Sequence, residues 1–164
     1  MRKLLKAFIQ KIKENSPGFT LLEIFIVIAI IGILMGIALP NFITYRYKGK
    51  IANAISEIKS IDKSIVKYRI ENNELPDSLA DINKGFLIDP WGRPYRYLRI
   101  DGSTTPGING NRRRDKNANP VNSDYDLYSM GRDGKTTPQF TAKNAHDDIV
   151  RASDGRYYGL AENH

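Results

Sequence analysis

"SPGFTLLEIFIVIAIIGILMGIALP", residues 16–40, is the stretch that decides the fold. Residues 24–39 contain no polar side chain, and residues 19–39 are apolar apart from Thr20 and Glu23. As an α-helix with a rise of about 1.5 Å per residue, residues 19–39 reach about 31 Å, which matches the roughly 30 Å hydrocarbon core of a bilayer. The sequence therefore predicts one membrane-spanning helix close to the N-terminus.

Positive charge is concentrated just before this helix. The formal net charge is +7, and residues 1–18 contribute +4 of it, with five basic residues and one acidic residue. A basic flank before an apolar helix favours an N-terminus in the cytoplasm. The remaining +3 is not interleaved with aromatic residues along one face, so nucleic acid is not expected as a partner. The chain has no cysteine, which excludes disulfides and thiolate sites.

Glu23 separates the functions that such a helix could have. A secretory signal would have its small-residue cleavage site after the apolar run, whereas Gly18 precedes the run. A plain signal anchor would have no use for a carboxylate, because an ionisable residue inside a span is costly and usually functional. If the chain is cut after Gly18, Phe19 gains a free amine, and Glu23 lies where a carboxylate suits the helix dipole. Packed copies would then neutralise amine and carboxylate across neighbours, which makes Glu23 an assembly register.

The basic leader, Gly18, the residues FTLLE (19–23) and the long apolar run resemble the class III signal of type IV pilins and type II secretion pseudopilins. The resemblance implies that a prepilin peptidase cuts after Gly18 and methylates the new amine, so that Phe19 becomes N-methylphenylalanine. It also implies that Glu23 aligns the incoming subunit. We therefore expect residues 1–18 to be a leader peptide that is removed from the mature chain.

Beyond Pro40 the pattern changes to that of an amphipathic helix. Apolar residues recur at spacings of three and four with charged residues between them; they are Ile51, Ala54, Ile55, Ile58, Ile61, Ile65 and Tyr68. One helix over about residues 19–72 would thus be a transmembrane stalk over 19–40 and an amphipathic continuation over 41–72. We expect its second half to pack on a sheet of its own head domain.

The head, residues 73–164, is predicted to contain short strands joined by long loops. Strand patterns lie within residues 89–100, 125–130 and 156–160, and residues 101–123 read as a long loop. The predicted fold is therefore α+β and pilin-like, with a long N-terminal helix packed on a small antiparallel sheet of about three strands.

Acidic residues after the second predicted strand indicate a possible metal site. Hard cations such as Ca²⁺ take carboxylate and carbonyl oxygens, and the alternative is a solvated loop in which aspartates form turns. The segments "DPWGRPYRYL", "DYDLYSMGRDG" and "DDI" resemble the major pseudopilin of type II secretion systems. That resemblance implies one structural Ca²⁺ in a loop at about residues 130–148, held by the Met130 carbonyl and by Asp133, Asp147 and Asp148.

Other chemistry is not expected. Residues 115–126 carry oxygen-bearing side chains at several EF-hand positions, but Pro120 stands where the sharp turn needs glycine. The two histidines, His146 and His164, have no nucleophile or second ligand at a meaningful spacing. The chain also has no phosphate-binding glycine loop, and we predict that it is not an enzyme.

The sequence leads to one main functional hypothesis. The chain is expected to be a major pseudopilin-like subunit that polymerises from the inner membrane into a pseudopilus and drives export of folded proteins. The expected topology is single-pass, with the N-terminus in the cytoplasm and the head in the periplasm. Implied partners are like subunits, minor pseudopilins, the prepilin peptidase, and an inner-membrane assembly platform with a cytoplasmic ATPase.

Two alternatives remain open at this point. A type IV pilin for adhesion, motility or DNA uptake would share the helix, although many such pilins close a C-terminal loop with a disulfide. A signal-anchored binding protein would recognise a ligand through the triplet Arg112, Arg113 and Arg114, and would tolerate the change Glu23→Ala. Such a triplet is more often a solvated cluster. The loop over 101–123 is longer than the short connection usual in pseudopilins.

Overall fold

The computed structural model describes residues 18–104 and 106–164. Its longest element is the helix α2, Leu21–Asn72, which has 52 residues. The chain divides into two compact units, one ending at Thr44 and the other comprising Tyr45–His164. The predicted leader lies outside the described residues except for Gly18.

Helix α2 continues through Pro40, which lies inside it. Proline lacks a backbone N–H and normally weakens a helix at this point. Side chains around Pro40 supply local hydrogen bonds: the Asn41 amide donates to the Ile37 carbonyl at 3.2 Å, and the Thr44 hydroxyl donates to the Pro40 carbonyl at 3.0 Å. Each bond runs from a side chain to the carbonyl four residues earlier, and α2 stays helical on both sides of the proline.

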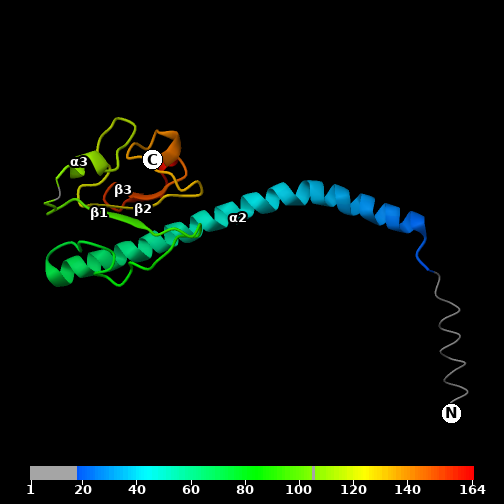
Figure 1. Ribbon diagram of the computed structural model, residues 1–164, viewed down its shortest axis with the longest axis horizontal. Helices are drawn as coiled ribbons and strands as arrows, with labels where there is room; N and C mark the ends of the chain where they lie inside the picture. Colours follow the sequence, from blue (N-terminus) through cyan, green and yellow to red (C-terminus); the bar gives the residue numbers. More distant parts are fainter. Residues whose placement is uncertain (1–17, 105) are drawn as a thin grey trace, which may run out of the picture. The chain divides into compact units, whose positions relative to one another are not determined.

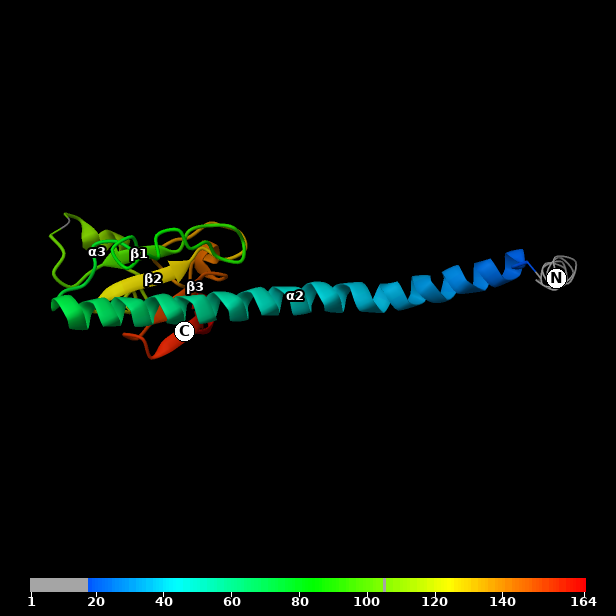
Figure 2. The same ribbon diagram turned by 90° about the horizontal axis from the view of Figure 1, so that it is seen from below.

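The head contains a four-stranded antiparallel sheet in the order β1-β2-β3-β4 (Figures 1 and 2). The strands are β1 (Arg96–Arg99), β2 (Tyr125–Ser129), β3 (Ile149–Ala152) and β4 (Tyr157–Leu160). Short helical turns are α3 (Ile108–Asn111), η1 (Lys143–Ala145) and η2 (Ala161–Asn163). The α+β pilin-like prediction is confirmed, and the sheet has one strand more than the three expected, namely β3.

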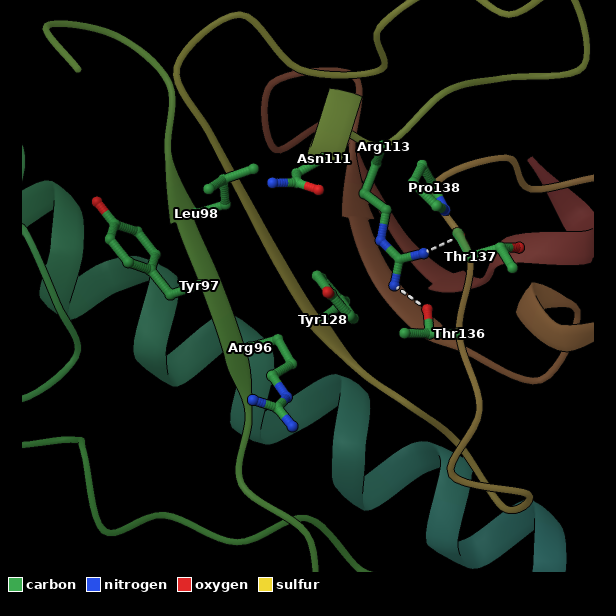
Figure 3. A pocket seen from close by; sticks show the side chains of 9 residues that line it. All are labelled: Arg96, Tyr97, Leu98, Asn111, Arg113, Tyr128, Thr136, Thr137 and Pro138. Carbon is green, nitrogen blue, oxygen red and sulfur yellow. Dashed lines mark hydrogen bonds between the residues drawn. The ribbon is translucent and has the colours of Figure 1, made fainter. Parts of the chain in front are cut away.

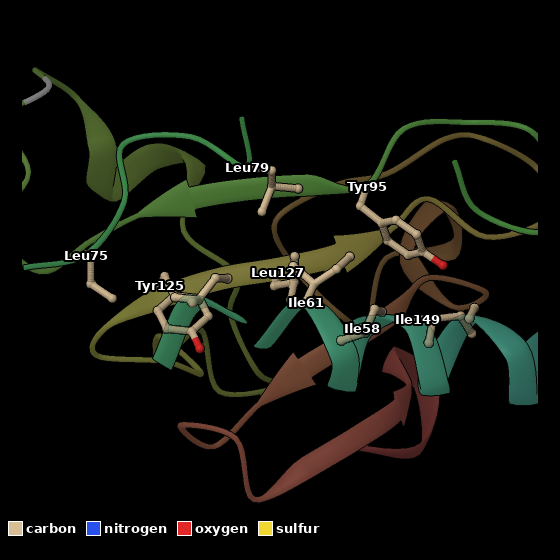
Figure 4. Close-up of a cluster of buried hydrophobic side chains, with 10 residues drawn as sticks. Ile58, Ile61, Leu75, Leu79, Tyr95, Tyr125, Leu127 and Ile149 are labelled. Atoms are coloured by element: carbon tan, nitrogen blue, oxygen red, sulfur yellow. The ribbon is translucent and has the colours of Figure 1, made fainter. Parts of the chain in front are cut away.

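The main core lies between the second half of α2 and one face of the sheet (Figure 4). The residues at helical spacing that the sequence placed on one face are indeed buried, among them Ala54, Ile58, Ile61 and Ile65. They pack with buried residues from the loops and strands, which are Leu75, Leu79, Tyr95, Tyr125, Leu127 and Ile149. Burial of this apolar surface is what holds the amphipathic half of α2 on the sheet.

Strand β3 is buried on both faces, which explains why it was not predicted from the sequence. Ile149 belongs to the core against α2, whereas Val150 and Ala152 belong to a second cluster with Val121, Phe140 and Ala161. All four residues of β3 are buried, including Arg151. A strand that is buried on both sides lacks the apolar–polar alternation by which short strands are recognised.

A buried polar network joins α2 to the sheet. Arg151 Nε donates to Asp62 Oδ1 at 2.5 Å, and the second end of its guanidinium donates to Asp124 at 2.7 Å. The hydroxyls of Tyr125 and Tyr158 also donate to Asp62, at 2.5 and 2.9 Å. Burial, followed by its hydrogen bond to Asp62, raises the pKa of Tyr125 above its usual value, so this hydroxyl stays a donor. The network connects one helix residue to β2, β3 and β4.

Candidate functional site

The first candidate site is the start of α2, where Thr20 and Glu23 bind each other. Glu23 Oε2 accepts hydrogen bonds from the Thr20 backbone N–H at 2.8 Å and from the Thr20 hydroxyl at 2.9 Å, and the Glu23 N–H donates to Thr20 Oγ1 at 3.2 Å. This reciprocal arrangement is a capping box, in which threonine and a glutamate three residues later satisfy the free N–H groups of a helix start. Sequence reasoning missed Thr20, although the spacing T-x-x-E announces it.

The bond between Gly18 and Phe19 lies immediately before this cap. Both residues are exposed and outside the helix, and Phe19 is 82% exposed. A β-carbon built on Gly18 would meet nothing within 4 Å. A peptidase needs an accessible and non-helical backbone, and the described part of the chain presents this bond in that form.

The apolar part of α2 is uncovered. Between Glu23 and Arg46 the chain carries no charged residue. By length and composition α2 is the one described helix that could cross a membrane, and none of its most apolar 18-residue window is buried. Nearly all its large side chains are half or more exposed, including Leu22, Phe25, Ile33, Leu34 and Ile37. Lipid or the same helix of neighbouring copies can cover such a surface.

The second candidate site is the loop between β2 and β3, residues 130–148, called the C-terminal loop below. Here the structure brings two of the predicted calcium ligands together. The Asp133 N–H donates to Asp147 Oδ2 at 2.9 Å, and the Met130 carbonyl accepts from the Gly134 N–H at 3.2 Å. Gly131 has a φ of +60°, and a β-carbon on it would lie only 2.0 Å from the Asp147 carbonyl oxygen. The backbone of the turn after β2 therefore lies directly against the backbone of Asp147.

Asp148, the fourth predicted ligand, turns to a different partner. Its side chain is completely buried, and Oδ2 accepts from Arg113 Nη2 at 2.9 Å and from the Thr136 hydroxyl at 2.5 Å. Burial raises the pKa of the Asp148 carboxyl, while the charge of Arg113 and the bond from Thr136 oppose that rise. Asp148 Oδ1 has no hydrogen-bond partner among the described residues.

A calcium ion held by all four predicted residues does not fit this arrangement. Met130, Asp133 and Asp147 lie at the turn after β2, but the Asp148 carboxylate is bound to a guanidinium. Among the residues that the structure describes, no three histidine, aspartate or glutamate side chains form a group that could hold a metal. The calcium site therefore stays a prediction of the family resemblance.

The position of Arg113 differs most from what the sequence predicted. It was expected to be solvated with its neighbours Arg112 and Arg114, but only 2% of it is exposed. Its guanidinium donates to Thr136 and to the Thr137 carbonyl, as Figure 3 shows, and borders a cavity of about 350 Å³. A buried arginine cannot be part of a docking surface, so the expectation of a solvated triplet is wrong for Arg113.

A comparison with protein families supports the assignment of the start of α2 as a processing motif. The family model for the "Prokaryotic N-terminal methylation motif" matches residues 15–39, which include Gly18, Phe19 and Glu23. No solved structure matches the chain.

Similar full-length proteins point to one family. The type II secretion system core protein G of Pseudomonas aeruginosa is 30% identical over 144 residues, which cover 75% of this chain and 88% of that protein. The proteins of the same name from Aeromonas hydrophila and Escherichia coli K12 are also 30% identical, covering 75% and 74% of this chain and 87% and 86% of their own lengths. The chain therefore belongs to the pilin-like family of type II secretion system core protein G, the major pseudopilins.

Proposed function

We propose that this chain is the major subunit of a type II secretion pseudopilus, which polymerises from the inner membrane and drives export of folded proteins. The observation that carries the proposal is the start of α2, where an accessible bond before Phe19 precedes Glu23 and a long uncovered apolar helix. Such a helix can be stored in a bilayer and later packed against the same helix of other copies. The function is mechanical, and no catalytic role is assigned.

The proposed partners and topology follow from the same arrangement. The basic N-terminal segment keeps that end in the cytoplasm, so the head lies in the periplasm after a single membrane pass. Like subunits pack along the apolar part of α2, and minor pseudopilins would complete the filament. A prepilin peptidase would process the bond after Gly18, and an assembly platform with a cytoplasmic ATPase would supply the work of extraction from the membrane.

Removing this chain from its host is expected to leave exported proteins folded in the periplasm. The measurement compares the activity of secreted enzymes in the medium and in the periplasm, with the chain restored from a plasmid as the control. Normal secretion together with a loss of long surface filaments would contradict the pseudopilus and would favour a surface pilus instead.

The change Gly18→Val is expected to block processing. A branched side chain beside the scissile bond hinders entry into a peptidase site, whereas glycine leaves the backbone open. With a co-expressed prepilin peptidase, mass spectrometry of the unchanged chain should show loss of residues 1–18 and one added methyl group on Phe19. Gly49→Val is the matched control, since a β-carbon there also meets nothing within 4 Å. Normal cleavage of the Gly18→Val chain would refute the assigned processing site.

A further inference from the structure

The environment of Arg113 consists of the kinds of oxygen atoms that hard cations bind. The hydroxyl of Thr136 and the carbonyl of Thr137 accept hydrogen bonds from its guanidinium (Figure 3), and so does a carboxylate oxygen of Asp148. Calcium ions in proteins take carboxylate, hydroxyl and carbonyl oxygens of this type. Here a side-chain cation already occupies the place toward which these oxygens point.

The backbone around Arg113 fixes this guanidinium in place. The Arg113 N–H donates to Asp126 Oδ2 at 2.7 Å, and its carbonyl accepts from the Val121 N–H at 3.0 Å. The next residue, Arg114, exchanges backbone hydrogen bonds with Pro138 and Phe140 on the C-terminal loop, at 2.9 and 3.0 Å. The segment around residue 113 thus lies between residues 120–121 and residues 138–140 of the loop.

The ring of Tyr128 packs against the guanidinium of Arg113. The guanidinium carbon of Arg113 lies 3.6 Å from the centroid of the Tyr128 ring. A cation over an aromatic face gains most where water is excluded, and this side chain is almost fully buried. Although it borders the cavity, the guanidinium is held by the hydrogen bonds to Asp148, Thr136 and Thr137 and by the Tyr128 ring, so Arg113 is far less free to move than a surface arginine.

A second cation near Asp148 would meet strong repulsion. Asp148 Oδ1 is buried and accepts no hydrogen bond from the described residues, so it is the oxygen of this carboxylate that is left for a metal ion. That oxygen belongs to the same carboxylate that Arg113 binds at 2.9 Å, so an ion there would lie within a few ångströms of the buried guanidinium. Like charges at such a distance in a poorly hydrated interior repel each other strongly.

Another arginine holds the other end of the loop. Arg93 Nη1 donates to the Gly131 carbonyl at 2.9 Å. Gly134 has a φ of +71°, and a β-carbon on it would collide with the Arg93 guanidinium. The Gly131 carbonyl at the turn after β2 is therefore also bound by a guanidinium, whereas the Met130 carbonyl accepts from the Gly134 N–H. An arginine thus contacts the loop at each end.

We propose that the buried guanidinium of Arg113 is the built-in cation that closes the C-terminal loop onto the sheet, so that the head folds without calcium. Arg93 supports the same loop at its start. The proposal concerns the stability of the head and does not depend on whether the chain polymerises. Under this proposal, the role of the long segment over 101–123 is to place Arg113 beside Asp148.

The test is thermal unfolding of the full chain in detergent, with excess calcium chloride and with excess chelator. Trp91 is the single tryptophan of the chain and lies in the head, with its ring centroid 6.3 Å from that of Tyr47, so its fluorescence reports the head. The expected result is the same midpoint in both conditions. A calcium site filled at a hundredfold excess over its Kd would raise the midpoint by roughly 10 °C, and such a shift would overturn the proposal.

Variants of two adjacent arginines complete the test. Arg113→Met is expected to lower the midpoint by roughly 10 °C with or without calcium, because it leaves the Asp148 carboxylate buried without a cation. Arg114→Met is the matched control and should change it by no more than about 2 °C, since among the described residues the Arg114 side chain bonds only the exposed Asn109 carbonyl. Equal midpoints for the two variants would refute the role of Arg113.

One variant covers the case in which Arg113→Met does not fold. Arg113→Lys keeps the positive charge but loses the fork that reaches Asp148, Thr136 and Thr137 together. An intermediate midpoint, still independent of calcium, is the expected result. A midpoint of the lysine variant that rises only when calcium is added would contradict the proposal, because it would show that calcium can enter beside a cation at this site.

Discussion

Replacing Glu23 by alanine is expected to reduce filament formation by about tenfold or more while leaving the protein in the membrane. Cleavage after Gly18 would leave a positive amine on Phe19 at the start of an apolar helix. Without a carboxylate on the neighbouring copy, each added subunit would place that amine unpaired among packed helices. Insertion into the bilayer depends on the apolar residues 24–39, which the change does not touch.

The capping box sharpens this experiment. In the single chain Glu23 Oε2 already accepts two hydrogen bonds from Thr20, so alanine removes both a cap and a charge. Glutamine can fill the same position of a capping box, but it carries no charge. The variant Glu23→Gln therefore separates the two roles, and Thr20→Ala removes the cap from the other side.

The expected outcome follows from the charge. Glu23→Gln should fail to form filaments almost as completely as Glu23→Ala, whereas Thr20→Ala should retain most of them. Electron microscopy of sheared filaments and immunoblotting of the membrane fraction measure the two effects separately. Abundant filaments from Glu23→Gln would mean that the helix cap, and not the paired charge, is what assembly requires.

The long helix could be predicted from the sequence because both of its halves carry strong local signals. Residues 19–39 are apolar enough for a bilayer, and the spacing of Ile58, Ile61 and Ile65 places them on one face, which the core confirms. Helical periodicity depends only on neighbours along the chain. The structure adds one fact about the start of the helix: in the single chain, Glu23 is hydrogen-bonded to Thr20.

Features that depend on distant parts of the chain escaped prediction. Strand β3 is four residues long and buried on both faces, so it has no alternating pattern. Arg113 looks like its neighbours in the sequence, and it is contacts with distant residues, among them Asp148 35 residues away, that remove it from solvent. The resemblance to pseudopilins gives Asp148 a calcium role, which stays a prediction, and nothing along the chain indicates that Arg113 faces this carboxylate.

The network around Asp62 leads to the second large effect, which is a loss of stability on changing Asp62 to alanine. Arg151 is 4% exposed and, among the described residues, would then keep only Asp124 as a charged partner. The hydroxyls of Tyr125 and Tyr158 would lose the oxygens to which they donate. Breaking a buried ion pair costs about 3–5 kcal/mol of the free energy of unfolding, and buried donors left unpaired add to this cost.

Asp77 provides the matched control for this change. Its carboxylate binds Arg99 Nη1 at 2.7 Å, but its side chain is 88% exposed. Arg99 is largely buried, but it keeps Glu74 at 3.8 Å and the Asp101 carbonyl at 3.1 Å when Asp77 is removed. Because the lost carboxylate is itself exposed, Asp77→Ala should alter the free energy of unfolding by no more than about 1 kcal/mol. Both variants are measured by urea unfolding of the full chain in detergent, with the fluorescence of Trp91 as the signal. Equal losses for the two variants would show that Asp124 alone suffices to hold Arg151.

A third variant distinguishes charge from shape at Asp62. Asparagine is the isosteric replacement, and the change Asp62→Asn keeps one oxygen for a tyrosine hydroxyl while removing the charge that Arg151 binds. Its loss should therefore fall between those of Asp77→Ala and Asp62→Ala. Apolar contacts have no directional requirement, whereas the Asp62 carboxylate meets Arg151 and two tyrosines from different strands with directed hydrogen bonds. Because that requirement is met at only one position of the helix, the network sets the register in which the head closes on α2.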